Sequence, residues 1–315
     1  MLQLDGLVRH FDNVHAVDHV TFSVDRGKVL GFIGPNGAGK TTTMRILATL
    51  DTPQGGDARI GGYSVVDDPD KVRRITGFMP DSAGVYAHTT VTEYLDFFAR
   101  AYNLRGAARR QAVASIIEFM GIGDLKDRNV ESLSKGLKQR VALGRALVHD
   151  PQVLILDEPA ANLDPRARIE FRALIRELAA DGKTILLSSH ILTELAEMCD
   201  LVTVIEKGRI LATGTVQEIL AGVRRHRILS LRIAGAAGHP DVNHADLERF
   251  LLEQPGVLNV HEAGGRTRFE FDGDDDAQAA LVSRLVAAGF RVVEFTAHGA
   301  GLEDLFIEIT KGQVQ

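Results

Sequence analysis

A glycine-rich segment stands between a short apolar run and a helical pattern. It follows the apolar residues 29–33 and leads into the helically spaced apolar residues Met44, Ile46 and Leu47. The segment fits the pattern G-x-x-x-x-G-K-[ST] and consists of Gly34, Pro35, Asn36, Gly37, Ala38, Gly39, Lys40 and Thr41. A strand, a glycine-rich loop and a helix form the context in which this pattern binds phosphate. The sequence therefore predicts an α/β domain that binds a nucleoside triphosphate.

The residue types of this loop suit a chain of phosphates. Glycines let successive backbone N–H groups point inward, and the helix that follows adds the positive end of its dipole. We expect Lys40 to meet the β- and γ-phosphates and the Thr41 hydroxyl to bind Mg²⁺, which bridges the same phosphates. The expected nucleotide-binding residues run from Gly34 to Thr42.

Two adjacent carboxylates follow a second apolar run. Asp157 and Glu158 come directly after residues 153–156, so they lie at the carboxyl end of an expected strand, where α/β sheets hold their ligands. Neighbouring side chains at a strand end point in different directions, which allows two roles. We interpret Asp157 as a magnesium ligand and Glu158 as the general base that polarises the attacking water.

The order of patterns predicts a layered N-terminal domain over residues 1–220. Alternation of apolar and polar residues in the first thirty, as in 20–24, predicts an antiparallel β layer. Wholly apolar runs suit parallel strands buried on both faces, and these are residues 29–33, 153–156, 184–187 and 201–205. The region from about 84 to 150 is rich in helical patterns, with a capping box at Thr90 and Glu93, and reads as a helical insertion.

A second, α+β domain is expected over residues 221–315. Its patterns predict strands and helices in the order βαββαβ, which is the ferredoxin-like layout. A further helix is expected from residue 301, and the acidic run from Asp272 to Asp276 is interpreted as a turn and a helix start. The predicted elements are strands 228–233, 257–262, 266–272 and 290–296, with helices 243–254 and 275–288.

Composition narrows the class of protein. A formal net charge of −6 over 315 residues provides no basic field for a phosphodiester backbone, so we expect no nucleic-acid partner. The lone cysteine, Cys199, stands among apolar neighbours and is expected to be a reduced structural thiol. The sequence shows neither a signal-peptide layout at Met1–Asp5 nor an apolar window of membrane length, so we expect the chain itself not to cross a bilayer.

A third segment resembles a known signature. The residues Leu133, Ser134, Lys135, Gly136, Leu137, Lys138, Gln139 and Arg140 stand about twenty residues before Asp157 and resemble the Leu-Ser-Gly-Gly-Gln signature of the ABC transporter ATPases. The resemblance implies an ABC cassette with a RecA-like core, the cofactors ATP and Mg²⁺, and head-to-tail dimers. In such dimers the signature of one protomer closes over the γ-phosphate held by the other. It implies that ATP is contacted in trans by Ser134, Lys135, Gly136, Leu137 and Asp164.

Other family elements occur in order, with departures. The resemblance implies that Phe11 stacks on adenine, that Asp164 belongs to the dimer-contacting D-loop, and that His190 acts with Lys40 and Glu158 in catalysis. Lys135 replaces the first signature glycine and Leu137 the glutamine. Asp81 stands where the family has a Q-loop glutamine, so we expect it near magnesium and the lytic water.

The chain further resembles the ATPases of type-two exporters through its Asn36-containing loop, its acidic residue at 81, residues 188–192 and residues 301–306. That resemblance implies a homodimer or heterodimer beneath a separately encoded permease, peripheral to the cytoplasmic face of the cell membrane. The alternatives are the ATPase of an ABC importer, which usually has a glutamine at the Q-loop, and a non-transport ABC protein. Whether the C-terminal domain regulates or only packs stays open, as does the cargo.

Overall fold

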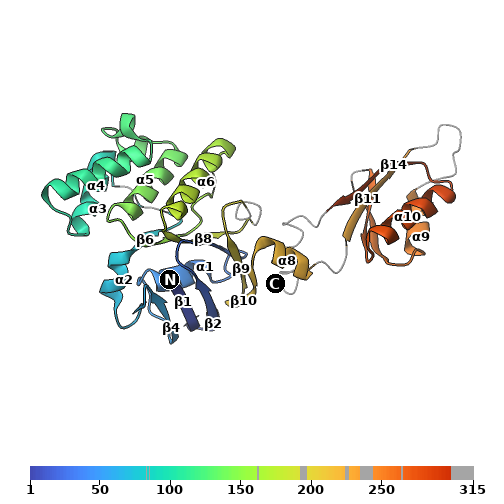
Figure 1. Cartoon of the computed structure of the whole chain (residues 1–315), viewed down its shortest axis with the longest axis horizontal. Coiled ribbons are helices and arrows are strands. Elements are labelled where there is room, and N and C mark those ends of the chain that lie inside the picture. The colour runs from blue at the N-terminus through green and yellow to red at the C-terminus, as the bar shows by residue number, and fades with distance from the viewer. Residues whose placement is uncertain are drawn as a thin grey trace. The chain divides into compact units, whose positions relative to one another are not determined.

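The computed structural model in Figure 1 describes residues 1–82, 84, 86–161, 163–191, 197–223, 227–234, 244–263 and 265–298. The chain divides into two compact units, Met1–Val216 and Gln217–Gln315, each of which is described by itself. Within the described ranges no helix has the length and apolar character needed to cross a membrane.

The first unit opens with an antiparallel sheet. Its strands are β1 (Leu2–Phe11), β2 (Val14–Val24), β4 (Gly55–Ile60) and β5 (Tyr63–Ser64), in the order β2-β1-β4-β5. Alternate side chains of β2, among them Val20, Phe22 and Val24, are buried, as the period-two pattern predicted. The predicted antiparallel β layer is therefore confirmed.

A six-stranded sheet forms the centre of the same unit, in the order β10-β9-β3-β8-β7-β6. Neighbours from β9 to β6 are parallel, and β10 adds an antiparallel edge. The four strands predicted from apolar runs are confirmed, whereas β6 and β10 were not indicated by the sequence. The strands are β3 (Val29–Ile33), β6 (Thr76–Met79), β7 (Val153–Leu156), β8 (Thr184–Ser189), β9 (Leu201–Glu206) and β10 (Arg209–Gly214).

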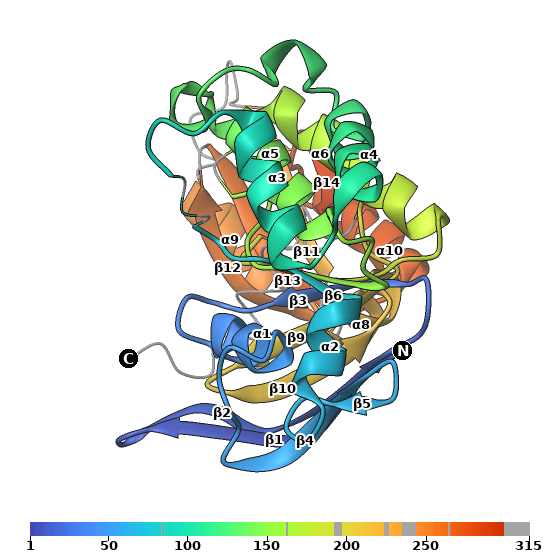
Figure 2. The same cartoon turned by 90° about the vertical axis from the view of Figure 1, so that its left-hand side faces the viewer.

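The helices of this unit lie around the central sheet. Three of them form a group on the side away from the antiparallel sheet (Figures 1 and 2). In Figures 1 and 2, helices α3, α4 and α5 gather at the end of the unit opposite β1, β2 and β4. The predicted capping box is confirmed, because Glu93 N donates to Thr90 Oγ1 at 3.2 Å and Thr90 N donates to Glu93 Oε2 at 2.9 Å. The helices of the unit are α1 (Lys40–Leu47), α2 (Pro69–Ile75), α3 (Val91–Ala101), α4 (Gly106–Phe119), α5 (Lys135–Leu147) and α6 (Pro165–Ala180), with 3₁₀ turns at Gly123–Leu125 and Val130–Ser132.

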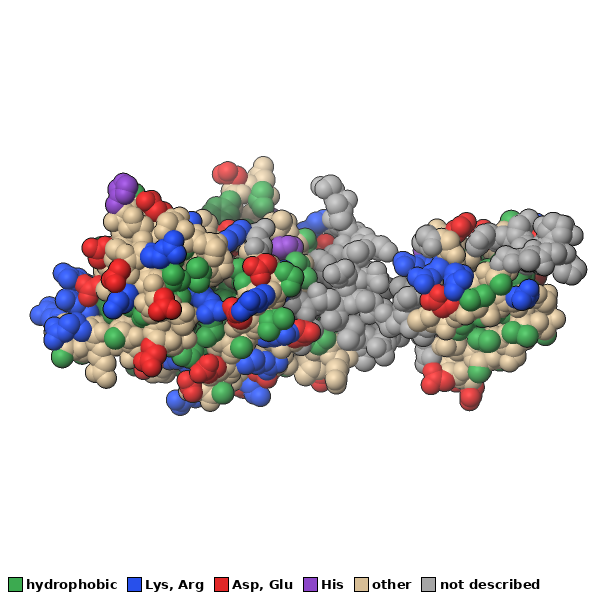
Figure 3. Space-filling view, turned by 90° about the horizontal axis from the view of Figure 1, so that it is seen from above, with side chains coloured by type: hydrophobic (Ala, Val, Ile, Leu, Met, Phe, Trp, Pro, Cys, Tyr) green, Lys and Arg blue, Asp and Glu red, His purple; other side chains and the backbone are tan. Residues whose placement is uncertain are grey.

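The surface of this unit carries both signs of charge. On the face shown in Figure 3, the blue Lys and Arg side chains are interspersed with the red Asp and Glu side chains over the first unit. Cys199 lies inside, where burial raises the pKa of its thiol, as expected for an unreactive structural cysteine.

The second unit is an α+β domain with the predicted order of elements. After α8 (Val216–Val223) come β11 (Arg227–Ile233), α9 (His244–Leu252), β12 (Val257–Ala263), β13 (Arg266–Phe271), α10 (Asp275–Ala287) and β14 (Val292–His298). The sheet is antiparallel in the order β12-β13-β11-β14 and packs a core that includes Leu229, Leu247, Phe269 and Leu281. The ferredoxin-like layout is confirmed. The predicted helix from residue 301 lies outside the described residues.

The acidic run from Asp272 to Asp276 includes the N-cap and the first residues of α10. The Asp274 side chain accepts a hydrogen bond from Ala277 N at 2.9 Å and so caps a helix that begins with two further aspartates. The interpretation of this run as a turn and a helix start is confirmed.

Candidate nucleotide site

Four parallel strands end at one edge of the central sheet. β3 leads into the glycine-rich loop, β6 leads to Asp81, β7 leads to Asp157 and Glu158, and β8 leads to His190. Because β3 pairs with β8, β8 with β7 and β7 with β6, these ends are neighbours. Residues that lie far apart in the sequence therefore share one edge, as expected for ligand sites in α/β sheets.

The glycine-rich loop depends on backbone conformations that glycine permits. Gly37 and Gly39 have positive φ angles of 80° and 107°, and α1 begins directly after Gly39. A Cβ atom at Gly39 would collide with the carbonyl oxygen of Ala16 in β2. The loop can pass this close to the antiparallel sheet only because residue 39 has no side chain.

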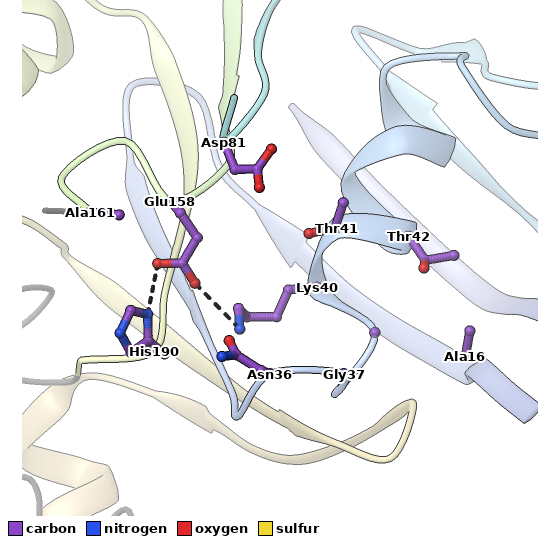
Figure 4. Close-up of a pocket in the computed structure, with 11 residues that line it drawn as sticks. Ala16, Asn36, Gly37, Lys40, Thr41, Thr42, Asp81, Glu158, Ala161 and His190 are labelled. Atoms are coloured by element: carbon purple, nitrogen blue, oxygen red, sulfur yellow. Dashed lines mark hydrogen bonds and ion pairs between the residues drawn. The ribbon is translucent and has the colours of Figure 1, made fainter. Parts of the chain in front are cut away.

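Lys40, Glu158 and His190 form a continuous chain of contacts across the site (Figure 4). The Lys40 ammonium lies 3.4 Å from Glu158 Oε1, and it also donates to the carbonyl oxygen of Gly34 at 2.7 Å. The second carboxylate oxygen, Glu158 Oε2, lies 2.9 Å from His190 Nδ1. Lys40 is 6% exposed, so its charge is held in place by these partners.

Glu158 occupies a strained position at the end of β7. Its φ angle is +47°, in the left-handed region that non-glycine residues rarely adopt, and such strain costs about 1 kcal/mol or more. The backbone N–H of Glu158 donates to Ser188 Oγ at 2.8 Å, which holds the turn. This backbone conformation directs the carboxylate toward Lys40 and His190.

Asp157 is a buried carboxylate with spare capacity for a ligand. Its Oδ1 accepts a hydrogen bond from Ser188 Oγ at 2.6 Å, whereas its buried Oδ2 has no hydrogen-bond partner among the described residues. Burial raises the pKa of Asp157, and the nearby carboxylates of Asp81 and Glu158 raise this pKa further. Hydrogen bonds from the Ser188 and Thr41 hydroxyls act in the opposite direction on the same pKa.

These oxygens fit a magnesium ion. Mg²⁺ takes oxygen ligands, and a cation next to the unpartnered Oδ2 of Asp157 would offset the cost of its burial. The Thr41 hydroxyl is close enough to hydrogen-bond the Asp157 side chain, and Asp81 is near enough to affect its pKa.

A cavity of about 340 Å³ collects most of the predicted residues of the loop and the strand ends. In Figure 4, Asp81 and Thr41 face one another across it, while Glu158 and His190 form one side. The lining residues are Ala16, Asn36, Gly37, Gly39, Lys40, Thr41, Thr42, Asp81, Glu158, Ala161 and His190. Gly34, Pro35 and Ala38 complete the loop without lining the cavity, and Asp157 lies buried beside it.

Both parts of the chain match known protein families. Residues 17–161 match the ABC transporter family, and residues 214–310 match the C-terminal domain of DrrA1-3-like ATP-binding proteins. The daunorubicin/doxorubicin resistance ATP-binding protein DrrA of Streptomyces peucetius is 34% identical over 310 residues, covering 98% of this chain and 92% of that protein. The chain belongs to the family of ABC transporter ATP-binding proteins.

Two further relatives point to the same type of ABC ATPase. The Nod factor export ATP-binding protein I of Ralstonia nicotianae is 32% identical over 311 residues, covering 98% of this chain and 94% of that protein. The linearmycin resistance ATP-binding protein LnrL of Bacillus subtilis is 27% identical over 98% of both chains. The chain is therefore the ATP-binding subunit of an export-type ABC transporter, and the resemblance noted in the sequence is confirmed.

Solved structures agree with membership of the ABC transporter family. A solved ATP-binding subunit of an ABC transporter is 32% identical, with a TM-score of 0.64, and the match covers 70% of this chain and 92% of that one. A dimeric bacterial ABC transporter cassette is 24% identical with a TM-score of 0.63, covers 69% of this chain and 99% of that one, and shows the fold alone.

The signature segment of this ABC ATPase does not line its own nucleotide cavity. Ser134 precedes α5, while Lys135, Gly136 and Leu137 form the first turn of that helix. None of these four residues lines the cavity described above. Ser134 and Lys135 are exposed, so they are accessible to another molecule.

Asp164 and Asp81 have neighbours that the sequence did not reveal. Asp164 is exposed and caps α6 by accepting a hydrogen bond from Ala167 N at 2.9 Å.

Asp81 lines both the nucleotide cavity and a second cavity of about 190 Å³, whose wall includes Lys135 and Lys138. Two of the three departures from the family pattern, Asp81 and Lys135, thus line one cavity.

Phe11 lies at the turn between β1 and β2 and does not line the cavity. Its ring is 44% exposed, and the Arg9 guanidinium lies over it with its carbon 4.5 Å from the ring centroid. One face of this aromatic ring is therefore already in contact with a cation.

Sequence reasoning missed two contributors to the site of the ABC ATPase. Ser188 bonds to both Asp157 and Glu158, whereas the sequence marked it only as the first residue of the segment 188–192 and not as a site residue. Ala16 lines the cavity from β2, and nothing in its residue type marks it.

Proposed function

We propose that this subunit binds ATP through residues 34–42 and hydrolyses it with Glu158 as the general base. The Lys40 ammonium would neutralise charge on the β- and γ-phosphates, and His190 would hold the Glu158 carboxylate and contact the γ-phosphate. The observation that carries this proposal is the continuous contact from Lys40 through Glu158 to His190 in one cavity. Phe11 is proposed to stack on the adenine from the turn between β1 and β2.

Magnesium is proposed to be held by Thr41, Asp157 and Asp81. When bound, it would neutralise charge on the phosphate oxygens. The buried, unpartnered oxygen of Asp157 supports this assignment. Ser188 holds the other Asp157 oxygen and thereby orients the carboxylate.

We propose that the site is completed by a second protomer in a head-to-tail dimer. Ser134, Lys135, Gly136 and Leu137 would contact the γ-phosphate that the partner holds, with the N-terminus of α5 directed at it, and Asp164 would contact the partner. The exposure of Ser134, Lys135 and Asp164, none of which lines the cavity of its own chain, supports trans action. Both a homodimer and a heterodimer are compatible with this arrangement.

Transport requires a second polypeptide. Because no described helix could span a bilayer, we propose that the subunit powers a separately encoded permease and is held by it at the cytoplasmic face of the membrane. The names of three relatives refer to resistance to daunorubicin/doxorubicin, resistance to linearmycin and export of Nod factor, and they support export as the direction.

Replacing Glu158 with glutamine tests the catalytic proposal, because the amide keeps the shape of the carboxylate but cannot take a proton. We expect Glu158→Gln to lower turnover by about two to four decades, or roughly 3 to 5 kcal/mol of barrier. A fluorescent ATP analogue should still bind. Glu177→Gln, an exposed change on α6, is the matched control. Turnover equal to that of the control would refute the role of Glu158.

A further inference from the structure

The hairpin between β1 and β2 brings two histidines together outside the nucleotide cavity. His10 and His15 are directly opposite one another in the antiparallel ladder, and their ring centroids lie 3.9 Å apart. Asp18 follows on β2, and one ligand atom from each of the three residues lies within 4.8 Å of the others. Cross-strand neighbours have side chains on the same face, which brings the two imidazoles together, and the 4.8 Å limit includes the Asp18 carboxylate.

His10 carries an unsatisfied polar atom in this cluster. Its Nε2 is buried and has no hydrogen-bond partner within the described parts of the chain. Buried nitrogen atoms of this kind are costly unless they bond to something. His15 is exposed, so the cluster has a side that is open to solvent.

Two other neighbours hold the Asp18 carboxylate in place. His19 Nδ1 lies 2.7 Å from Asp18 Oδ1, and Arg209 Nε lies 2.6 Å from Asp18 Oδ2. An ionised carboxylate has about four lone-pair positions, so each oxygen keeps one position for a further ligand.

We propose that His10, His15 and Asp18 form a binding site for one divalent transition-metal cation of the zinc type. Two imidazole nitrogens and one carboxylate oxygen are a ligand set that zinc accepts, with the fourth position left to water. Tetrahedral zinc holds its ligand atoms about 3.4 Å apart, so the three side chains need to move by only about 1 Å. Magnesium, which prefers oxygen ligands, remains with the carboxylates at the sheet edge.

The position of this zinc site connects it to the nucleotide cavity. Ala16, next to His15 on β2, lines that cavity, and its carbonyl oxygen is in close contact with Gly39 of the phosphate loop. A cation bound to His10, His15 and Asp18 would therefore stiffen the β1–β2 hairpin where it meets the loop. This consequence rests on the proposed function, whereas binding of the cation does not.

Titration of the tag-free full-length chain with Zn²⁺ tests the site directly. The readout is competition with a chromophoric chelator, without nucleotide and with Mg²⁺ in excess to occupy the oxygen ligands near Asp157. We expect His15→Ala to lose one zinc equivalent, or to bind it at least about tenfold more weakly than the unaltered chain. His10→Ala should do the same.

Two variants make the result specific. His88→Ala removes a histidine that is 88% exposed on the helical part of the chain, and it should leave zinc binding unchanged. His15→Cys keeps a zinc ligand at the same place and should retain the equivalent that His15→Ala loses. The proposal is overturned if His15→Ala binds zinc as the unaltered chain does, or if His88→Ala lowers binding equally. Because no ATPase activity enters the readout, failure here would leave the proposed hydrolysis untouched.

Discussion

Nδ1 of His190 lies 2.9 Å from Oε2 of Glu158, a contact that joins the residues following β8 and β7. The contact orients a carboxylate that already sits on a strained backbone. We expect His190→Ala to lower kcat by about a hundredfold while changing KM for ATP much less, because binding rests mainly on the phosphate loop. His190→Gln can still donate a hydrogen bond to Glu158 and should retain more activity than the alanine variant. Steady-state ATPase kinetics of the two variants show whether residue 190 acts by orienting the Glu158 carboxylate or only by filling space.

Ser188 is expected to support both the stability of the fold and the binding of magnesium, because it bonds to Asp157 and Glu158. Ser188→Ala removes the donor to Asp157 Oδ1 and the acceptor of the Glu158 backbone N–H, leaving buried polar groups unpaired. The expected loss is about 1 to 3 kcal/mol of unfolding free energy, with a higher Mg²⁺ requirement for hydrolysis. Ser132→Ala, which loses only an exposed bond to Asn129, is the control. Equal stability and equal Mg²⁺ dependence of the two variants would contradict this role.

Trans assembly predicts complementation between two inactive variants. Ser134→Arg should damage the signature that a protomer presents to its partner, and Lys40→Ala should damage the loop that the protomer keeps for itself. In a mixed dimer one of the two sites has both an intact loop and an intact signature. An equal mixture should therefore recover up to about a quarter of the normal rate, since about half of the dimers are mixed. A mixture as inactive as either variant alone, at every ratio, would argue for a site complete within one chain.

His149 makes the fold sensitive to acid. Burial lowers the pKa of His149 to about 4, although its ring stacks on Tyr102 at 3.5 Å between centroids and bonds to the Thr76 carbonyl oxygen at 3.1 Å. The unfolded chain takes up this proton near pH 6.5, so the stabilisation is complete above pH 6.5 and falls as the pH drops toward 4. The slope is at most about 1.4 kcal/mol per pH unit.

The matched variant for this pH dependence is His149→Phe, which keeps a ring against Tyr102 but cannot be protonated. Urea unfolding at pH 7.5 and at pH 5 should show that the unaltered chain loses about 1 to 2 kcal/mol more than the variant. Parallel losses in the two proteins would show that His149 is not the group responsible.

Strands and loops with strong local signals could be predicted from the sequence. The apolar runs of β3, β7, β8 and β9 are buried on both faces, and the capping box at Thr90 marks the start of α3. In the C-terminal unit the alternation of patterns was sufficient for the whole βαββαβ order. These elements were predictable because each carries its periodicity within its own residues.

Elements that depend on distant partners could not be predicted in this way. β6 contains Gly77, and a Cβ atom there would collide with the Ala146 carbonyl oxygen of α5, so its place in the sheet depends on tertiary packing. Likewise, Ser188 gains its importance only when β8 lies beside β7. The second cavity, shared by Asp81 and Lys135, arises from segments more than fifty residues apart.

The contact between Gly39 and Ala16 limits how this protein can change over evolutionary time. Any side chain at position 39 would need β2 to move, and a shift of β2 would alter the wall of the nucleotide cavity. Substitutions in the hairpin and in the phosphate loop are thus not independent of one another. An insertion that lengthened the β1–β2 turn would therefore have to preserve the path of the chain at Ala16.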